Sequence, residues 1–191
     1  MSTTLQAAVL VAMMRLPCPA EEPAEECRPW RTTVSIAIAD VAETMTCEGK
    51  PADCVREWSG PADELAAMLV EIAYHESGLR RRIQEGRCRD DECDAVRSLR
   101  TKRWTGKHLA RSMWQLHRTP EIPGIEALVS RERWLASVGA EPAAIRLAAT
   151  TAARVLRESP ASFGGVSITS PGPRGHKARA ILARIRAARE N

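Results

Sequence analysis

The segment from residue 59 to 78, SGPADELAAMLVEIAYHESG, constrains the fold more than any other part of this chain. It carries the signals of a helix start, because Ser59 is a candidate cap, Pro61 suits the first turn, and two acids follow where the helix dipole favours them. Apolar side chains then recur at helical spacing: Leu65, Met68, Leu69 and Ile72. The pattern predicts a helix with one buried face that ends at Gly78.

Glu76 continues the apolar face of this predicted helix, four residues after Ile72. Burial against apolar side chains raises the pKa of a carboxyl group, and an acid that stays protonated near neutral pH can donate a proton to a leaving glycosidic oxygen. Glu76 is therefore a candidate general acid. The alternative is a structural glutamate that pairs with a neighbour such as Arg80 or Arg81.

The rest of the chain favours a single, mainly α domain over residues 1–191, rich in alanine, arginine and leucine. We expect N-terminal helices within 5–46, a central part over 59–117 and C-terminal helices within 124–190. Pro29 and Trp30 begin the second of these helical patterns. The stretch KHLARSMWQLH predicts a further short helix, with Leu109, Met113 and Trp114 on its apolar side. Residues 79–104 between them are expected to be a long irregular insert.

Six cysteines fall into three close pairs: Cys18 with Cys27, Cys47 with Cys54, and Cys88 with Cys93. This spacing favours three disulfides that each close a short loop, and hence an oxidising destination, although other pairings and free buried thiols stay open. No C-x-x-C, H-E-x-x-H or other ligand spacing is present, so no metal site and no cofactor is expected.

Charge is distributed unevenly along the chain. Residues 1–78 carry 5 Lys and Arg against 13 Asp and Glu, whereas residues 79–191 carry 23 against 11. A basic second half suits a polyanionic partner such as nucleic acid, an acidic membrane surface or the bacterial cell wall. A solvated arginine-rich surface explains the same composition equally well. No window is apolar enough for a membrane span, and the N-terminus shows no clear signal peptide.

Two segments resemble those of lysozyme-like lytic transglycosylases. IAYHESG is similar to the end of the family's catalytic helix, in which a glutamate is followed by serine. ARSMWQLH, further along the chain, is similar to the family's Gly-Leu-Met-Gln segment, with Gln115 as the matching residue. The resemblance covers residues 66–117 and implies a lysozyme-like helical domain.

The family resemblance also implies the roles of individual residues. Glu76 would be the single catalytic acid that cleaves the β-1,4 bond between N-acetylmuramic acid and N-acetylglucosamine, and then the base that helps to form a 1,6-anhydro product. Ser77 would position Glu76 or substrate, and Gln115 would line the glycan groove. Tyr74 and Trp104 are further candidate substrate-binding residues, because sugars stack on aromatic rings.

The sequence leaves several alternatives open. The acids of the insert, Asp90, Asp91, Glu92 and Asp94, could supply the second carboxylate of a hydrolase. Family members tend to carry a tyrosine that hydrogen-bonds the catalytic glutamate from a later helix, whereas the one tyrosine here is Tyr74. A non-catalytic wall-binding or structural module of the same fold is therefore the second hypothesis.

A third hypothesis is a nucleic-acid binder that uses Arg179, Arg184 and Arg186 of the last predicted helix. Nucleic acid is not the expected partner, however, because the apolar residues of that helix already explain it as an amphipathic helix packed on the core. We expect peptidoglycan glycan strands as partner, a monomer or a component of a larger assembly, and a location in the periplasm, the cell wall or a phage particle.

Overall fold

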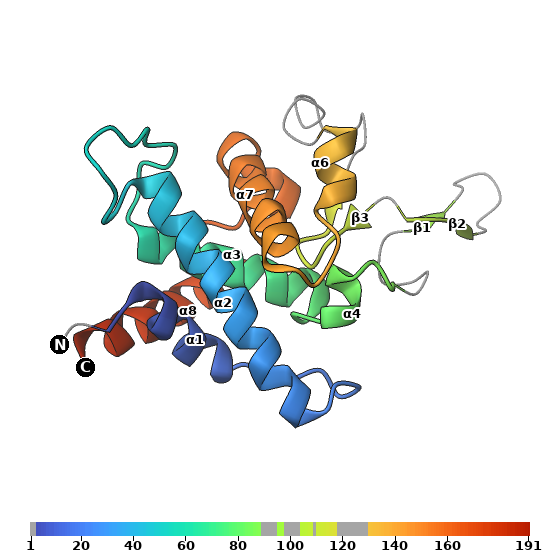
Figure 1. Ribbon diagram of the computed structural model, residues 1–191, viewed down its shortest axis with the longest axis horizontal. Coiled ribbons are helices and arrows are strands. Elements are labelled where there is room, and N and C mark those ends of the chain that lie inside the picture. The colour runs from blue at the N-terminus through green and yellow to red at the C-terminus, as the bar shows by residue number, and fades with distance from the viewer. Residues whose placement is uncertain (1–2, 89–94, 98–103, 109, 118–129) are drawn as a thin grey trace.

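Helices dominate the computed structural model, which describes residues 3–88, 95–97, 104–108, 110–117 and 130–191 (Figure 1). The helices are α1 (Leu5–Met14), α2 (Ala24–Thr46), α3 (Ala62–Ser77), α4 (Arg81–Gln84), α6 (Arg131–Ala136), α7 (Pro142–Glu158), the short 3-10 helix η1 (Pro160–Phe163) and α8 (Pro173–Glu190). The strands are β1 (Ala95–Arg97), β2 (Trp104–His108), β3 (Ala110–Arg111) and β4 (Leu116–His117). The prediction of a mainly helical chain is confirmed.

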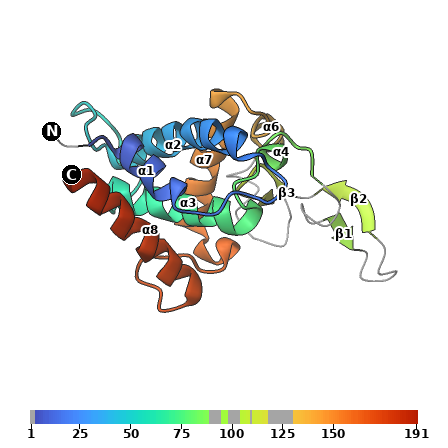
Figure 2. The ribbon, with the colours of Figure 1, turned by 90° about the horizontal axis from the view of Figure 1, so that it is seen from below.

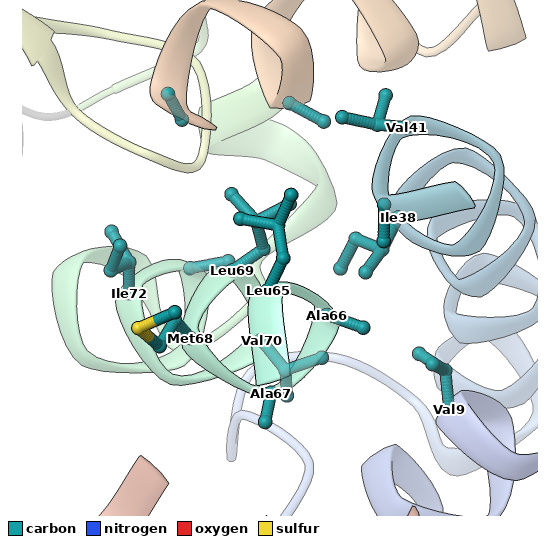
Figure 3. Close-up of a cluster of buried hydrophobic side chains, with 14 of the residues drawn as sticks. Val9, Ile38, Val41, Leu65, Ala66, Ala67, Met68, Leu69, Val70 and Ile72 are labelled. Carbon is teal, nitrogen blue, oxygen red and sulfur yellow. The ribbon is translucent and has the colours of Figure 1, made fainter. Parts of the chain in front are cut away.

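Helix α3 forms the centre of the core. Its apolar side chains belong to one core cluster with Val9 of α1 and with Ile38 and Val41 of α2, and Ala66 points toward α2 (Figure 3). The predicted apolar face of α3 is buried throughout, and Gly78 ends the helix in a left-handed conformation. Ser59 is not the cap, however, because the helix begins after Pro61 and the amide of Ala62 donates to the Glu48 carboxylate at 3.3 Å.

Four helices, α1, α2, α7 and α8, contact α3. Helices α1 and α8 also pack on one another, and α7 packs on α2 (Figures 1 and 2). Helix α2 begins at Ala24, earlier than the predicted start at Pro29. The helix can begin early because the amides of Glu26 and Cys27 both donate to the carbonyl of Pro23. Acidic side chains in the first turn also interact favourably with the helix dipole.

Two of the predicted disulfides are present. Cys18–Cys27 joins the α1–α2 connection to the first turns of α2, and Cys47–Cys54 closes the loop after α2. Cys88 is also disulfide-bonded, but its predicted partner, Cys93, lies outside the described residues. The described helices include none that is both long enough and apolar enough to cross a membrane.

The helix predicted for KHLARSMWQLH is wrong. Strand β2 reaches His108, and β3 and β4 form an antiparallel pair that a turn from Ser112 to Gln115 connects. Ser112 and Gln115 both have left-handed φ angles, of 65° and 49°, which a helix cannot contain. Leu109 lies outside the described residues.

The predicted irregular insert contains regular structure as well. Helix α4 follows α3 closely, and β1 pairs antiparallel with β2, Ala95 opposite His108 and Arg97 opposite Trp104. The two views agree that this ribbon extends away from the helical body (Figures 1 and 2).

Candidate functional site

The end of α3 is fixed by contacts that lie beyond the helix itself. The amide of Leu79 donates back to the Ala73 carbonyl at 3.3 Å, and the indole Nε1 of Trp30 donates to the Leu79 carbonyl at 2.7 Å. Gly78 supplies the left-handed turn, at a φ of 64°, which costs glycine little. Glu76 is therefore placed by a helix end that is tied to α2.

Glu76 lines a cavity of about 370 Å³. The described lining consists of Pro17, Cys18, Pro19, Tyr74, His75, Glu76, Ser77, Gly78, Arg80 and Lys177. The side chain of Glu76 is 26% exposed. The prediction that Glu76 continues the buried face is thus corrected: the helix ends there, and the site opens to solvent.

The most deeply buried carboxylate of α3 is Glu71, whose side chain is only 2% exposed. Arg174, in the first turn of α8, binds both acids. Its Nη2 donates to Glu71 Oε2 at 3.0 Å, and its Nη1 donates to Glu76 Oε1 at 2.9 Å. The sequence analysis missed Glu71 and Arg174, because Arg174 lies 98 residues from Glu76 and no spacing rule connects them.

Arg31 fixes the segment that includes Pro17, one of the residues that line the cavity. This buried side chain donates from Nη1 to the carbonyls of Met13 and Leu16, and from Nη2 to Pro17, each at 2.7 Å. Desolvation lowers the pKa of Arg31 below its usual value. The carbonyls at the end of α1 thereby gain a partner, and the adjoining Cys18–Cys27 disulfide fixes the same segment.

Two predicted site residues share this cavity with Glu76. Tyr74 is half-buried and packs against the core, and Ser77 is buried. The Ser77 hydroxyl donates to the Ala73 carbonyl at 2.8 Å. Its contact is therefore with the backbone of α3, and any effect on Glu76 would act through the helix end.

Gln115 is not part of the described lining of this cavity, although it was predicted to line the same groove. It is buried, and its Nε2 donates to the Ser112 carbonyl at 3.4 Å. The turn that carries it is tied to α3, since the indole of Trp114 donates to the Leu69 carbonyl at 3.0 Å. Trp114 is a core residue, as predicted.

Other predicted groups cannot be placed at the site. The backbone of Trp104 lies in β2, but its side chain is outside the described residues, and so are Asp90, Asp91, Glu92 and Asp94. Within the described part of the chain, no three His, Cys, Asp or Glu side chains gather as a metal site.

Comparison with models of protein families, with curated proteins and with solved structures finds no match to this chain.

Proposed function

We propose that this protein is a peptidoglycan-cleaving glycosidase with a lysozyme-like fold, a lytic transglycosylase that uses Glu76 as its acid and base. The observation that carries the proposal is the position of Glu76. Glu76 lies in the last turn of the central core helix and lines a cavity of about 370 Å³, in whose described lining it is the one acid.

The connection between the two family-like segments supports the proposal. HESG is the end of α3, and the SMWQ turn is bonded to the same helix through Trp114 and Leu69. Segments that are distant in sequence are therefore attached to one rigid element, as a site built from both would require.

A single carboxylate is sufficient for the proposed reaction. Glu76 first donates a proton to the glycosidic oxygen, the C1–O bond breaks, and the N-acetylglucosamine side leaves as an alcohol. The resulting carboxylate then accepts the proton of the muramic acid 6-hydroxyl while that oxygen bonds to C1, which forms the 1,6-anhydro ring and restores the acid. Hydrolysis would instead place water at C1, commonly with help from a second carboxylate.

The partner and location are part of the same proposal. Glycan strands of peptidoglycan are the substrate, and the cell wall, the periplasm or a phage particle is the place of action. The disulfides support an oxidising destination, because such bonds persist outside the cytosol.

Mass spectrometry of the fragments released from purified peptidoglycan tests the proposal. We expect anhydro-muropeptides from the wild type and a loss of at least about 100-fold in Glu76→Gln, because the general acid is removed. Glu64→Gln is the matched control, since it makes the same chemical change in the first turn of α3, away from this cavity. Fragments with reducing ends would indicate a hydrolase, and undiminished release by Glu76→Gln would overturn the role of Glu76.

A non-catalytic wall-binding module is the second candidate function. The observation that favours it is the ion pair between Arg174 and Glu76, which can be purely structural. This candidate predicts that the wild type sediments with peptidoglycan on several wall types but releases no fragments, and that Glu76→Gln binds as well as the wild type.

A further inference from the structure

We propose that Arg174 is a positioning residue for Glu76, and that the buried Glu71 anchors Arg174 in this role. The inference rests on the proposed function of Glu76, but it adds residues that the chemistry alone does not require. It concerns one guanidinium group, which connects a core carboxylate to the carboxylate at the cavity.

The guanidinium divides its donors between the two acids. Nε lies 3.2 and 3.3 Å from the two oxygens of Glu71, and Nη2 lies 3.0 Å from Oε2 of the same group. Nη1 remains for Glu76, at 2.9 Å. Several charge-assisted contacts with a buried acid fix the plane of a guanidinium, whereas one contact alone leaves it free to turn.

Burial decreases along this chain of contacts. The side chain of Glu71 is 2% exposed, that of Arg174 is 15% exposed and that of Glu76 is 26% exposed. Removal of a buried charge from its partner is costly, so Glu71 and Arg174 hold one another firmly. The weaker contact at the exposed end is the one that substrate can alter.

The loop before α8 leaves the guanidinium little space. A Cβ added at Gly164 would lie 3.1 Å from Nη1 and 3.3 Å from Cδ of Arg174. Gly175, the next residue of α8, is close to the backbone of the same loop, where an added Cβ would lie 2.7 Å from the Ser167 carbonyl oxygen. The start of α8 is therefore fixed on both sides.

This arrangement has a defined effect on the proposed reaction. The donor bonded to Oε1 of Glu76 fixes the orientation of the carboxyl group that both steps use. The other charged or titratable residues that line the same cavity are His75 on α3, Tyr74 beside it, Arg80 after the helix and Lys177 on α8. Arg174 is the described group in ion-pair contact with Glu76, so its loss has the largest effect.

The test compares Arg174→Gln and Arg174→Lys with the wild type by steady-state cleavage of glycan strands. In Arg174→Gln we expect kcat to fall about tenfold with little change in KM, because the orientation of Glu76 is lost. Arg174→Lys keeps a cation and a donor at this position, so it should recover part of the loss in kcat. Unchanged kcat in Arg174→Gln would overturn the inference.

The matched control is Arg186→Gln. Arg186 connects α8 to the other end of α3, through Asp63 and Glu64, so its loss removes a bridge between the same two helices without contact to Glu76. We expect its kcat and KM to equal those of the wild type. If Arg174→Gln does not fold, the double variant Glu71→Gln, Arg174→Gln removes the buried charge together with its partner, and the same changes are expected.

Carbon NMR of the Glu76 carboxyl at a single pH near neutral distinguishes the two failures. The chemical shift of this carboxyl carbon should change in Arg174→Gln and stay unchanged in Arg186→Gln, whether or not the protein cleaves glycan. A wild type without cleavage but with this change in Arg174→Gln would overturn the proposed function and support the contact. An active wild type with no such change would overturn the positioning role alone.

Discussion

Gly164 is the residue that leaves the guanidinium of Arg174 its space. It adopts a φ of 63°, and a side chain there would meet Nη1 and Cδ of Arg174. Gly165, its neighbour, has a similar φ of 69°, but an added Cβ would meet nothing within 4 Å. Two adjacent glycines therefore share the same backbone requirement and differ in whether they contact the site.

This difference predicts distinct results for two alanine variants. Gly164→Ala and Gly165→Ala should each lower the free energy of unfolding by about 1 kcal/mol, because left-handed backbone is unfavourable for alanine. We expect only Gly164→Ala to reduce glycan cleavage as well, since it displaces Arg174. Urea unfolding and fragment release measure the two effects. Equal activity in both variants would show that the guanidinium position does not matter.

At the scale of elements, the long helices could be predicted from the sequence, but α4 and the turn before β4 could not. Periodic apolar residues identify α3 because its own side chains form the buried face. The turn at Ser112 instead depends on distant partners: Met113 donates its amide to Gln84, and Trp114 donates its indole to Leu69. Met113 and Trp114 are buried in the turn, and they would also be buried on the apolar face of a helix. The positions of apolar residues therefore do not distinguish the turn from the predicted helix.

The same limit applies to the candidate site. Glu76 could be found because HESG ends a periodic helix. Arg174 could not be found, because it reaches Glu76 from another helix, α8. The sequence at the start of α8, GPRG, shows no pattern that indicates a contact with a carboxylate.

The bond between the turn and α3 predicts a stability difference between two tryptophans. Trp114→Phe keeps an aromatic ring in the core but removes the donor to the Leu69 carbonyl, so we expect a loss of about 1–2 kcal/mol in urea unfolding. Trp134→Phe is the control, because its indole makes a similar bond to Leu116 at 2.9 Å from a half-buried position. An equal or larger loss in Trp134→Phe would contradict the importance of the core bond.

At the scale of the whole molecule, the uneven charge of the sequence becomes a set of internal ion pairs. Arginines of α7 and α8 bind carboxylates of the first 78 residues: Arg146 with Asp40, Arg154 with Glu57, Arg174 with Glu71 and Glu76, Arg186 with Asp63 and Glu64, and Arg189 with Glu48. The basic second half is thus partly neutralised by the acidic first half. The count of basic residues in the sequence therefore overstates how strongly this protein would attract polyanions, because these arginines are already paired with carboxylates.

The pair of Glu57 and Arg154 predicts how stability depends on pH. Arg154 donates to both oxygens of Glu57, at 2.9 and 2.8 Å, and these hydrogen bonds hold the pKa of Glu57 below its usual value of 4.5. A lowered pKa means that the folded state binds a proton less readily than the unfolded state. The stabilisation is therefore fully present above about pH 4.5 and is lost as the pH falls through the lower folded value.

Urea unfolding of the wild type and Glu57→Gln from pH 3 to pH 7 tests this dependence. Near neutral pH we expect the variant to be less stable by about 1 kcal/mol, because a bidentate, partly buried pair is lost. The difference should shrink below pH 4.5, where protonated Glu57 increasingly resembles glutamine in charge. Arg154→Gln should show the same narrowing against the wild type, since it removes the other half of the pair. A gap that stayed constant down to pH 3 would mean that packing, and not charge, connects the loop after α2 to α7.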